Sequence, residues 1–546
     1  MIPTLSEKIL NICKEVFPRE EILAVALYGS RAGGYARIDS NYDILLIINN
    51  YLSELRYHNH IFDETYLSIL AVDQDLLEFD AEEGGLGDFI SGRLTSPYVS
   101  LQNREYLKQI ELIVKRRFIE EDLLDLTFEY GILAKELIIK PEYFALARMR
   151  KRSRLYPPLR YSYYYMLRKD LKIKNLNNIL KGYKTVLKRL EEEGYIRKVD
   201  ENICLTDHYV DKNLSNRTLK QVINVVQLGQ KTINSYLVHG LAGLSSYNII
   251  IKELTSKIKR ELQSRSDVKE LEDPKNYLFL ETSKGLVSLN ERASIIEASM
   301  KFKKADHITI QPLGGILNEV YLIEADNEKI VAKKFTDWFG FKWFTLNLVA
   351  LGSKQFTVAG KERLANEYSM NLILSKKEIS VPEILFINPE ERLLLTRYIN
   401  GLNVLELVRN SFYMDKLSEK QISYARDIGK LFAKIHSENI SIGDNKPENL
   451  IISERDQIYI VDLEQASQGG DFVWDVAEFL YYAGHFGFDI NSGFLDFIKA
   501  VIGGYVEGGG EVSTLRNAAN LLYYKSFLIW TSTPIIMKIR EILKKS

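Results

Sequence analysis

The stretch IHSENISIGDNKPENLII occupies residues 435–452, and IYIVDLE follows it at residues 458–464. The first stretch contains Asp444 and, five positions later, Asn449. The second is a short apolar run that predicts a strand and ends in Asp462. This order of an aspartate, an asparagine, a strand and a second aspartate decides how the C-terminal half is interpreted.

Length and composition indicate a folded chain of several domains. With 546 residues the chain exceeds one ordinary core, which predicts about three or four units. The hydrophobic share is 46% and the charged share is 27%, as in globular proteins. Lysine plus arginine (72) nearly balances aspartate plus glutamate (73), so the net charge indicates neither a nucleic-acid nor a membrane partner.

The cysteines and the apolar segments predict a soluble cytoplasmic protein. Cys13 and Cys204 lie far apart and form no CxxC motif, which indicates neither a metal site nor a disulfide framework and fits a reducing compartment. Residues 1–8 lack the basic and apolar regions of a signal peptide. The apolar region at residues 521–537 is interrupted by a lysine and a proline and is too short for a membrane span.

The opening stretch resembles the catalytic and metal-binding segments of kinase-fold phosphotransferases. The resemblance implies that Asp444 positions the attacking hydroxyl and accepts its proton, while Lys446 steadies the transferred phosphoryl group. It also implies that Asn449 and Asp462 hold magnesium, an ion that prefers oxygen ligands and phosphates.

Two neighbouring residues have structural roles in the same resemblance. Asp475, within WDVAEF at residues 474–479, matches the helix aspartate that braces the catalytic loop in this family. His436 is interpreted as a structural hydrogen-bonding residue.

A glycine-containing segment upstream fits the resemblance. A strand at residues 307–310 leads through Gly314, Gly315 and Asn318 into a second strand at residues 320–323. The pattern is similar to the Gly-Gly-x-x-Asn-x-Val-Tyr loop of the aminoglycoside and choline phosphotransferases, which covers the ATP phosphates. Glycines there let the backbone approach the phosphates closely.

The next strand supplies the expected lysine. IVAKKF at residues 330–335 resembles V-A-I-K, so Lys333 would neutralise the alpha and beta phosphates, with Lys334 on the opposite strand face as the weaker choice. The acidic partner of this lysine would be Glu367 in the following helical pattern, with Glu362 as the alternative.

Departures from the protein-kinase pattern narrow the resemblance. The triplet at residues 442–444 is Ile-Gly-Asp rather than His-Arg-Asp, and the triplet at residues 462–464 is Asp-Leu-Glu rather than Asp-Phe-Gly. Only residues 463–474 separate the metal aspartate from the bracing aspartate, which leaves no room for a long activation loop. This shortness resembles the RIO kinases, the kinase subunit of the archaeal KEOPS complex and small-molecule phosphotransferases. The aromatic segment at residues 337–344 is interpreted as local core or as a docking surface.

The N-terminal region contains the pattern of a second phosphate site. An apolar run at residues 22–28 predicts a buried strand, and Gly29, Ser30 and then Asn41-x-Asp43 follow it. This resembles the nucleotidyltransferase superfamily, in which a Gly-Ser turn cradles a triphosphate and an Asp-x-Asp pair holds two metal ions.

The metal ligands depart from that family. Asn41 stands in place of the first carboxylate, and an amide oxygen carries no net charge against a hard cation. The apolar strand at residues 66–72 has Ser68 near its centre and Asp73 only after its end, so the third carboxylate is also unclear. A fold retained for binding or scaffolding is therefore favoured over transferase activity through Asp43.

The central region is basic. Residues 148–174 hold ten lysines and arginines against one acid, with five interleaved tyrosines, the composition of a phosphate-tracking surface. A helix at residues 177–193, Gly194 and a hairpin at residues 195–205 then resemble a winged helix-turn-helix. The candidates for nucleic-acid contact are Lys181, Lys184, Lys188 and Arg189. The alternatives are a solvated face and a rigid spacer.

These patterns predict a multidomain α+β protein of archaeal type. It comprises a nucleotidyltransferase-like α/β domain with closing helices (1–145), a basic segment with a winged helix-turn-helix (146–212), a helical linker region (213–275) and a bilobal protein kinase-like domain (276–546) whose small lobe ends near residue 399.

The predicted function is that of an atypical serine/threonine-type kinase with ATP and Mg²⁺ as cofactors. It would phosphorylate a protein or itself, or couple ATP hydrolysis to an RNA, tRNA or protein partner, and RNA or DNA would bind at the central helix. The alternatives are a nucleic-acid-binding regulator with vestigial catalytic domains and a nucleotidyltransferase acting through Asp43.

Overall fold

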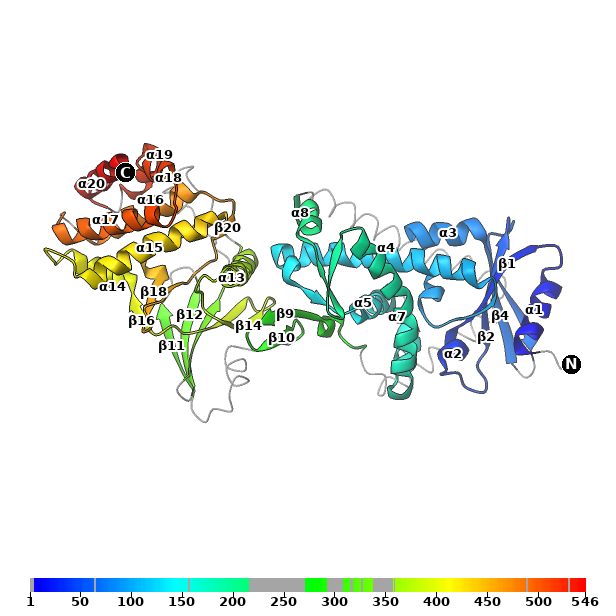
Figure 1. The fold of residues 1–546 in the computed structure, drawn as a ribbon. Coiled ribbons are helices and arrows are strands. Elements are labelled where there is room, and N and C mark those ends of the chain that lie inside the picture. Colours follow the sequence, from blue (N-terminus) through cyan, green and yellow to red (C-terminus); the bar gives the residue numbers. More distant parts are fainter. Residues whose placement is uncertain are drawn as a thin grey trace. The chain divides into compact units, whose positions relative to one another are not determined.

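The computed structural model divides into two compact units, one of residues 1–129 and 137–279 and one of residues 130–136 and 280–546 (Figure 1). It describes residues 4–62, 65–155, 158–215, 271–291, 308–314, 318–325, 328–336, 357, 359–487, 490–528 and 531–546. Gly315, the aromatic segment at 337–344 and most of the expected helical linker region lie outside the described residues.

The first unit begins with a five-stranded mixed sheet of order β3-β4-β2-β1-β5. β1 and β2 are antiparallel, whereas β2 and β4 are parallel. The strands are β1 (Glu21–Tyr28), β2 (Tyr42–Asn49), β3 (Leu55–Phe62), β4 (Thr65–Asp73) and β5 (Val99–Gln102). The strand expected at 22–28 is therefore confirmed, and α2 (Gly29–Gly33) follows it directly.

Hydrophobic cores form on both faces of this sheet because successive side chains of a strand point to opposite sides. One core includes Ile9 and Cys13 of α1 (Leu5–Val16). The other includes residues of α3 (Gln74–Glu83) and of the long helix α4 (Arg104–Tyr130). The sheet is thus covered by helices on both sides (Figure 1).

The central helices and hairpin follow the expected order, with one longer helix. They are α5 (Glu142–Leu155), α6 (Pro158–Met166), α7 (Lys169–Glu192), β7 (Ile196–Val199), β8 (Asn202–Leu205) and α8 (Asp207–Ser215). α7 begins at Lys169 rather than at residue 177, and the added part of the helix includes the buried residues Asn175 and Leu176. Gly194, with φ 78°, ends this helix region in the left-handed conformation that glycine tolerates.

The hairpin belongs to a second small sheet. β8 pairs with β6 (Ile138–Ile139), and β6 pairs with the start of β9 (Leu278–Thr282), which follows the 3-10 turn η3 (Pro274–Tyr277).

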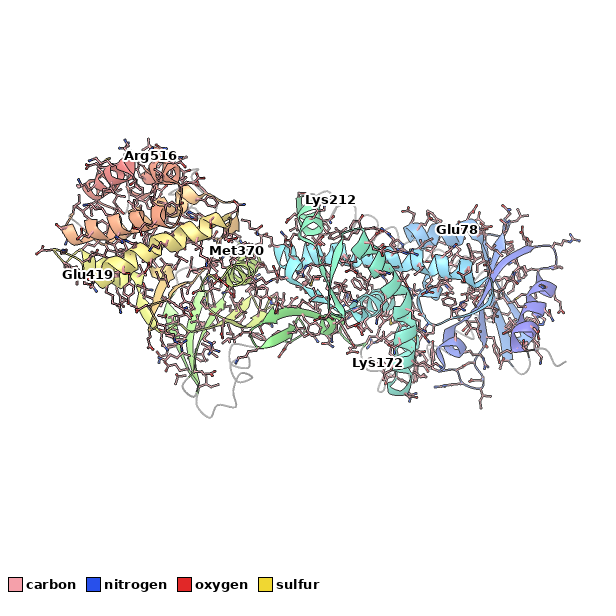
Figure 2. The ribbon with its side chains drawn as sticks, viewed as in Figure 1. Glu78, Lys172, Lys212, Met370, Glu419 and Arg516 are labelled. Carbon is pink, nitrogen blue, oxygen red and sulfur yellow. The ribbon has the colours of Figure 1, made fainter. Side chains whose placement is uncertain are left out.

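The second unit contains an antiparallel five-stranded sheet of order β11-β12-β13-β15-β14. Its strands are β11 (Ile308–Gly314), β12 (Glu319–Ala325), β13 (Glu328–Lys334), β14 (Ile384–Asn388) and β15 (Leu393–Arg397). α13 (Gly360–Lys376) carries the helical pattern that contains Glu367, and Met370 on this helix is buried (Figure 2).

A mainly helical part follows the sheet in the same unit. Its helices are α14 (Val404–Ser411), α15 (Glu419–Ser437), α16 (Phe472–Ala483), α17 (Ser492–Glu507), α18 (Val512–Ala518), α19 (Leu521–Tyr524) and α20 (Thr533–Lys545). Its strands are β16 (Gly401–Asn403), β17 (Ile440–Ser441), β18 (Leu450–Ser453), β19 (Ile458–Ile460) and β20 (Ser467–Gln468). Among the helices that the structure describes, none is long and apolar enough to cross a membrane.

Candidate functional site

Lys333 stands at the centre of the polar site of the second unit. It lies on β13 between β12 and β15, opposite Val320 and Leu394. Its Nζ atom is 2.6 Å from Asp462 Oδ1, 3.1 Å from Glu464 Oε2 and 3.3 Å from Glu367 Oε2. Burial alone would lower the pKa of this lysine, but the three carboxylates raise that pKa well above its usual range. Lys333 is therefore a fixed positive charge.

Glu367 is the helix partner of Lys333. It lies on the buried face of α13, whereas the alternative, Glu362, is exposed on the first turn of the same helix. Burial raises the pKa of Glu367 to about 7; Lys333 acts in the opposite direction, and the nearby carboxylates of Asp462 and Glu464 add to the rise. The predicted choice of Glu367 over Glu362 agrees with this contact.

A second network ties Glu464 to Asn318, which directly precedes β12. Arg363, fully buried on α13, donates from Nη1 to Glu464 Oε1 at 3.0 Å and to Asn318 Oδ1 at 2.8 Å. Asn318 Nδ2 donates to Glu464 Oε2 at 2.7 Å. The amide expected to serve ATP binding is therefore bonded to Glu464 and Arg363. Gly314 ends β11 and pairs with Val320 of β12.

Sequence reasoning missed Arg363 and assigned no role to Glu464. The available signal was the Asp-Leu-Glu triplet, which puts a second acid two positions after Asp462.

The segment at residues 443–449 brings the other predicted residues together. Lys446 Nζ lies 2.6 Å from Asp444 Oδ1, and Asn449 Nδ2 donates to the Asp444 carbonyl at 2.9 Å. Burial alone would lower the pKa of Lys446, but Asp444 and Glu478 raise it. Gly443 has φ 82° and Asp462 has φ 64°, so the backbone turns sharply on both sides of β18 and β19.

Two carboxylates of α16 bind backbone N–H groups of this segment and of the residue before it. Asp475, which is fully buried, accepts from the backbone N–H of Ile442 at 2.6 Å and of Gly443 at 2.8 Å. Its Oδ2 also lies 3.2 Å from His436 Nε2. One turn later Glu478 accepts from the Asn445 N–H at 2.8 Å. The bracing role predicted for Asp475 and the structural role predicted for His436 match these contacts, and Glu478 adds a second brace that the sequence pattern did not indicate.

The acidic side chains around Lys333 offer a suitable donor set for a hard cation. Among the residues that the structure describes, one group of His, Cys, Asp or Glu could hold a metal ion: Glu367, Asp462 and Glu464, whose oxygens lie within 4.8 Å of one another. The Asp462 side chain is 33% exposed, while those of Glu367 and Glu464 are nearly buried. Asp462 is thus the most accessible of the three, and all-oxygen donors are what Mg²⁺ prefers.

The predicted residues of the N-terminal site also lie on neighbouring elements. Gly29, with φ 75°, begins α2 directly after β1, and Asp43 on β2 lies opposite Tyr28. A Cβ atom at Gly29 would overlap the Asp43 carboxylate, which shows how closely that carboxylate approaches the turn that continues with Ser30. On the other side of β2, Ser68 of β4 is the direct neighbour of Asp43.

Asn41 and Asp73 do not complete a set of carboxylates there. Asn41 directly precedes β2 and is half-buried. Asp73 ends β4, where it caps α3 and accepts from the Tyr51 N–H at 2.7 Å.

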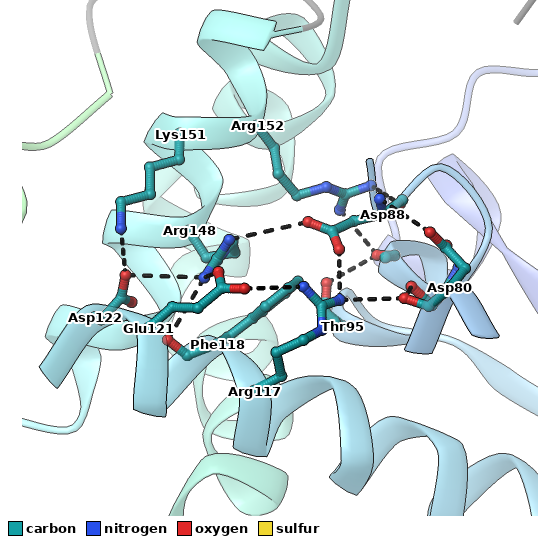
Figure 3. Close-up of polar contacts among 12 residues, drawn as sticks. Asp80, Asp88, Thr95, Arg117, Phe118, Glu121, Asp122, Arg148, Lys151 and Arg152 are labelled. Carbon is teal, nitrogen blue, oxygen red and sulfur yellow. Dashed lines mark hydrogen bonds and ion pairs between the residues drawn. The ribbon is translucent and has the colours of Figure 1, made fainter. Parts of the chain in front are cut away.

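The basic segment at residues 148–174 corrects the expectation of a phosphate-tracking surface. Arg148 and Arg152 are buried, and Figure 3 shows Arg148 and Lys151 facing acidic side chains of α4. Arg152 instead donates to backbone carbonyls of the loop around Asp88. Lys151 pairs with Asp122 at 2.6 Å, and Arg148 pairs with Glu121 at 2.7 Å. α5 packs against α4 through these ion pairs, so the inner half of the segment is internal structure.

The candidate nucleic-acid residues on α7 lie on an exposed face. The opposite face of this helix carries buried apolar residues, including Tyr183 and Leu190. The exposed candidates are Lys181, Lys184, Lys188 and Arg189.

A comparison with protein families matches the first part of the chain. The family model described as polymerase beta, nucleotidyltransferase matches residues 7–91, from α1 to the beginning of the 3-10 turn η1 (Ser91–Thr95). Residues 7–91 therefore form a nucleotidyltransferase domain within a mixed α/β multidomain chain.

Proposed function

We propose that the second unit is an ATP- and Mg²⁺-dependent phosphotransferase of the atypical kinase type. The single observation that carries the proposal is the position of Lys333, which is bound by Glu367 and lies 2.6 Å from Asp462. A lysine shared between a helix glutamate and a metal-binding aspartate is the arrangement that orients nucleotide phosphates for transfer.

The residues present fit the cofactors that this function requires. Asp462 and the amide of Asn449 supply oxygen ligands suited to Mg²⁺, and Lys333 supplies a positive charge for the phosphates. Magnesium bound there would neutralise charge on the beta and gamma phosphates.

The proposed transfer uses Asp444 and Lys446. Asp444 orients the acceptor hydroxyl and takes its proton as the hydroxyl oxygen bonds to the gamma phosphorus. The bond from that phosphorus to the bridging oxygen breaks, and ADP leaves with the electron pair. Lys446, 2.6 Å from Asp444, balances negative charge on the transferred group. Asp475 and Glu478 keep this segment in place, which makes the geometry preorganised.

The proposed acceptor is a serine or threonine hydroxyl, including one of this chain, or water in an ATPase cycle coupled to a partner. The segment after Asp462 is short and is tied back by β17–β20 pairing, with the Gly469 N–H donating to the Asn439 carbonyl at 2.7 Å. It provides no long platform for an extended peptide, which favours acceptor selection by other surfaces.

The test incubates the full chain with gamma-labelled and with alpha-labelled ATP. The informative variant is Asp462→Asn, because asparagine tolerates the left-handed backbone while removing the charge. Asp456→Asn is the matched control, since Asp456 also has a left-handed backbone, φ 60°, and is exposed in the β18–β19 turn. Gamma label on protein, or released phosphate, that Asp462→Asn abolishes and Asp456→Asn preserves supports the proposal. Transfer of alpha label alone would contradict it.

We propose nucleic-acid binding at α7 as a second function. The supporting observation is that Lys181, Lys184, Lys188 and Arg189 are all exposed on one helix face. Lysines arranged in this way neutralise backbone phosphates and make binding depend on salt.

A salt titration tests this second function. Labelled RNA and DNA oligonucleotides are titrated with the chain and with a variant in which Lys181, Lys184 and Lys188 are alanine. The slope of log K against log salt should fall by about one for each phosphate that the variant no longer neutralises. A control triple variant of Lys538, Lys544 and Lys545 on α20 should leave the slope unchanged. Equal slopes in both variants would exclude α7 as the binding surface.

A further inference from the structure

The described residues around Asp43 do not supply the donors for a two-metal centre. On the sheet face of Asp43 the neighbouring position on β4 is Ser68, and the position two residues before Asp43 is Asn41. Among the described residues, the one acidic group that could hold a metal ion does not include Asp43. One carboxylate with a neutral amide and a neutral hydroxyl does not balance two divalent cations, so the two metals of this family do not fit here.

A cation of the protein itself lies on the same face. Arg93, from η1, donates from Nη2 to the Tyr57 hydroxyl at 2.9 Å and forms a hydrogen bond with Tyr28, the residue opposite Asp43. Its guanidinium is 4.2 Å from the centre of the Phe89 ring. Its Nε atom has no hydrogen-bond partner among the described residues. Arg93 therefore brings a permanent positive charge to the part of the domain where metal ions would otherwise supply charge.

The loop that carries Arg93 is held rigidly. The buried carboxylate of Asp80 accepts from the backbone N–H groups of Leu86, Asp88, Ile90 and Ser91, at 2.9 to 3.2 Å. Arg152 donates to the carbonyls of Gly92 at 2.9 Å and of Asp88 at 3.0 Å, and Figure 3 shows Arg152 of α5 and Asp80 of α3 beside this loop. The charge of Arg93 is thus preorganised, which lowers the cost of ordering it around a ligand.

We infer that this nucleotidyltransferase domain binds a polyphosphate ligand, of the nucleoside triphosphate class, without divalent metal and does not transfer a nucleotidyl group. Arg93 takes the place of the metal ions in neutralising the phosphates, beside the turn formed by Gly29 and Ser30. The domain would then report the presence of its ligand without consuming it.

The experiment uses the full chain carrying Asp462→Asn, which weakens the separate cation site of the second unit. Inorganic tripolyphosphate is titrated by calorimetry in EDTA and again in excess Mg²⁺. Binding in EDTA, changed less than about twofold by Mg²⁺ and weakened about tenfold or more by Arg93→Ala, is the expected result. Arg37→Ala, at an exposed arginine of the loop before β2, should have no effect. Arg93→Lys should recover part of the affinity and serves as the check on folding.

A Mn²⁺ titration gives a second readout. The double variant Asn41→Asp/Ser68→Asp should gain Mn²⁺ binding that the unmodified domain lacks, and tripolyphosphate binding should then depend on metal. The inference is overturned if tripolyphosphate does not bind in EDTA, if Arg93→Ala behaves like Arg37→Ala, or if the unmodified chain binds Mn²⁺ in a manner that Asp43→Asn abolishes.

Discussion

Asp475→Asn tests the bracing of residues 442–445 by α16. Asp475 is fully buried; its Oδ1 accepts from the Gly443 N–H and its Oδ2 from the Ile442 N–H, with His436 3.2 Å from Oδ2. An asparagine keeps one oxygen and turns an NH₂ group toward the other backbone N–H. The variant thus removes a charge-assisted hydrogen bond and leaves a buried donor unsatisfied, at a combined cost of about 2–5 kcal/mol. For a unit of this size that is roughly 5–15 °C in Tm.

Asp471→Asn is the matched control, because the same chemical change occurs one helical turn earlier. Asp471 caps α16 by accepting from the N–H groups of Val473 at 3.0 Å and Trp474 at 3.1 Å, and asparagine caps helices equally well. The expected cost is about 0–1 kcal/mol.

The assay is thermal unfolding of the full chain, with hydrogen exchange of peptides covering residues 440–446 to assign the transition. Asp475→Asn should lower the Tm and accelerate exchange at the Ile442 and Gly443 amides, and Asp471→Asn should do neither. Indistinguishable Tm values and exchange rates for the two variants would refute the bracing argument.

Three further predictions concern internal packing and burial. Arg152→Met should destabilise the first unit by about 2–5 kcal/mol in urea unfolding, because it strips the loop before η1 of its buried donors, while Arg154→Met at an exposed position should stay within about 0.5 kcal/mol. Burial raises the pKa of the Cys13 thiol from 9.0 to about 12, so between these pH values the folded state retains a proton that the unfolded state loses. The contribution of Cys13 to stability should therefore fall as the pH rises from about 9 to 12, and Cys13→Ala should abolish that dependence. Rapid labelling of Cys13 in the folded chain at pH 8 would contradict the burial. In α17, Gly504→Ala should lower the free energy of unfolding by about 1–3 kcal/mol, because the new Cβ would overlap a backbone carbonyl of α15. At Gly503 a Cβ meets nothing within 4 Å, so Gly503→Ala should raise the free energy of unfolding by about 0.4–1 kcal/mol. If chemical denaturation shows that both variants change this free energy in the same direction, the packing difference is refuted.

The sequence predicted the elements that carry some of the candidate site residues. The strand before Asp462 and the helix bearing Glu367 follow from apolar periodicity and from motif order. Glu367 was preferred to Glu362 on the same grounds, since only a residue on the buried helix face can meet a lysine in the sheet.

Local sequence patterns could not predict the contacts between segments that are distant in the chain. The network of Asn318, Arg363 and Glu464 joins three segments separated by 45 and 101 residues, and no local spacing encodes it. The basic run was misjudged for the same reason: Arg148 and Lys151 meet acids of α4 that lie 26 to 29 residues earlier, and these pairs appear only when α5 packs on α4.

The left-handed backbone at Asp462 limits how this position can change over evolutionary time. At φ 64° the backbone of a β-branched or bulky residue would be strained, while aspartate, asparagine and glycine adopt this left-handed conformation more readily. A lineage that no longer needed the carboxylate at this position would therefore drift first to asparagine or glycine here, with the surrounding fold undisturbed. The chain already holds an asparagine where an acid is expected, at Asn41 of the other domain, so an amide at position 462 in a related chain would mark the loss of a second carboxylate without any change in architecture.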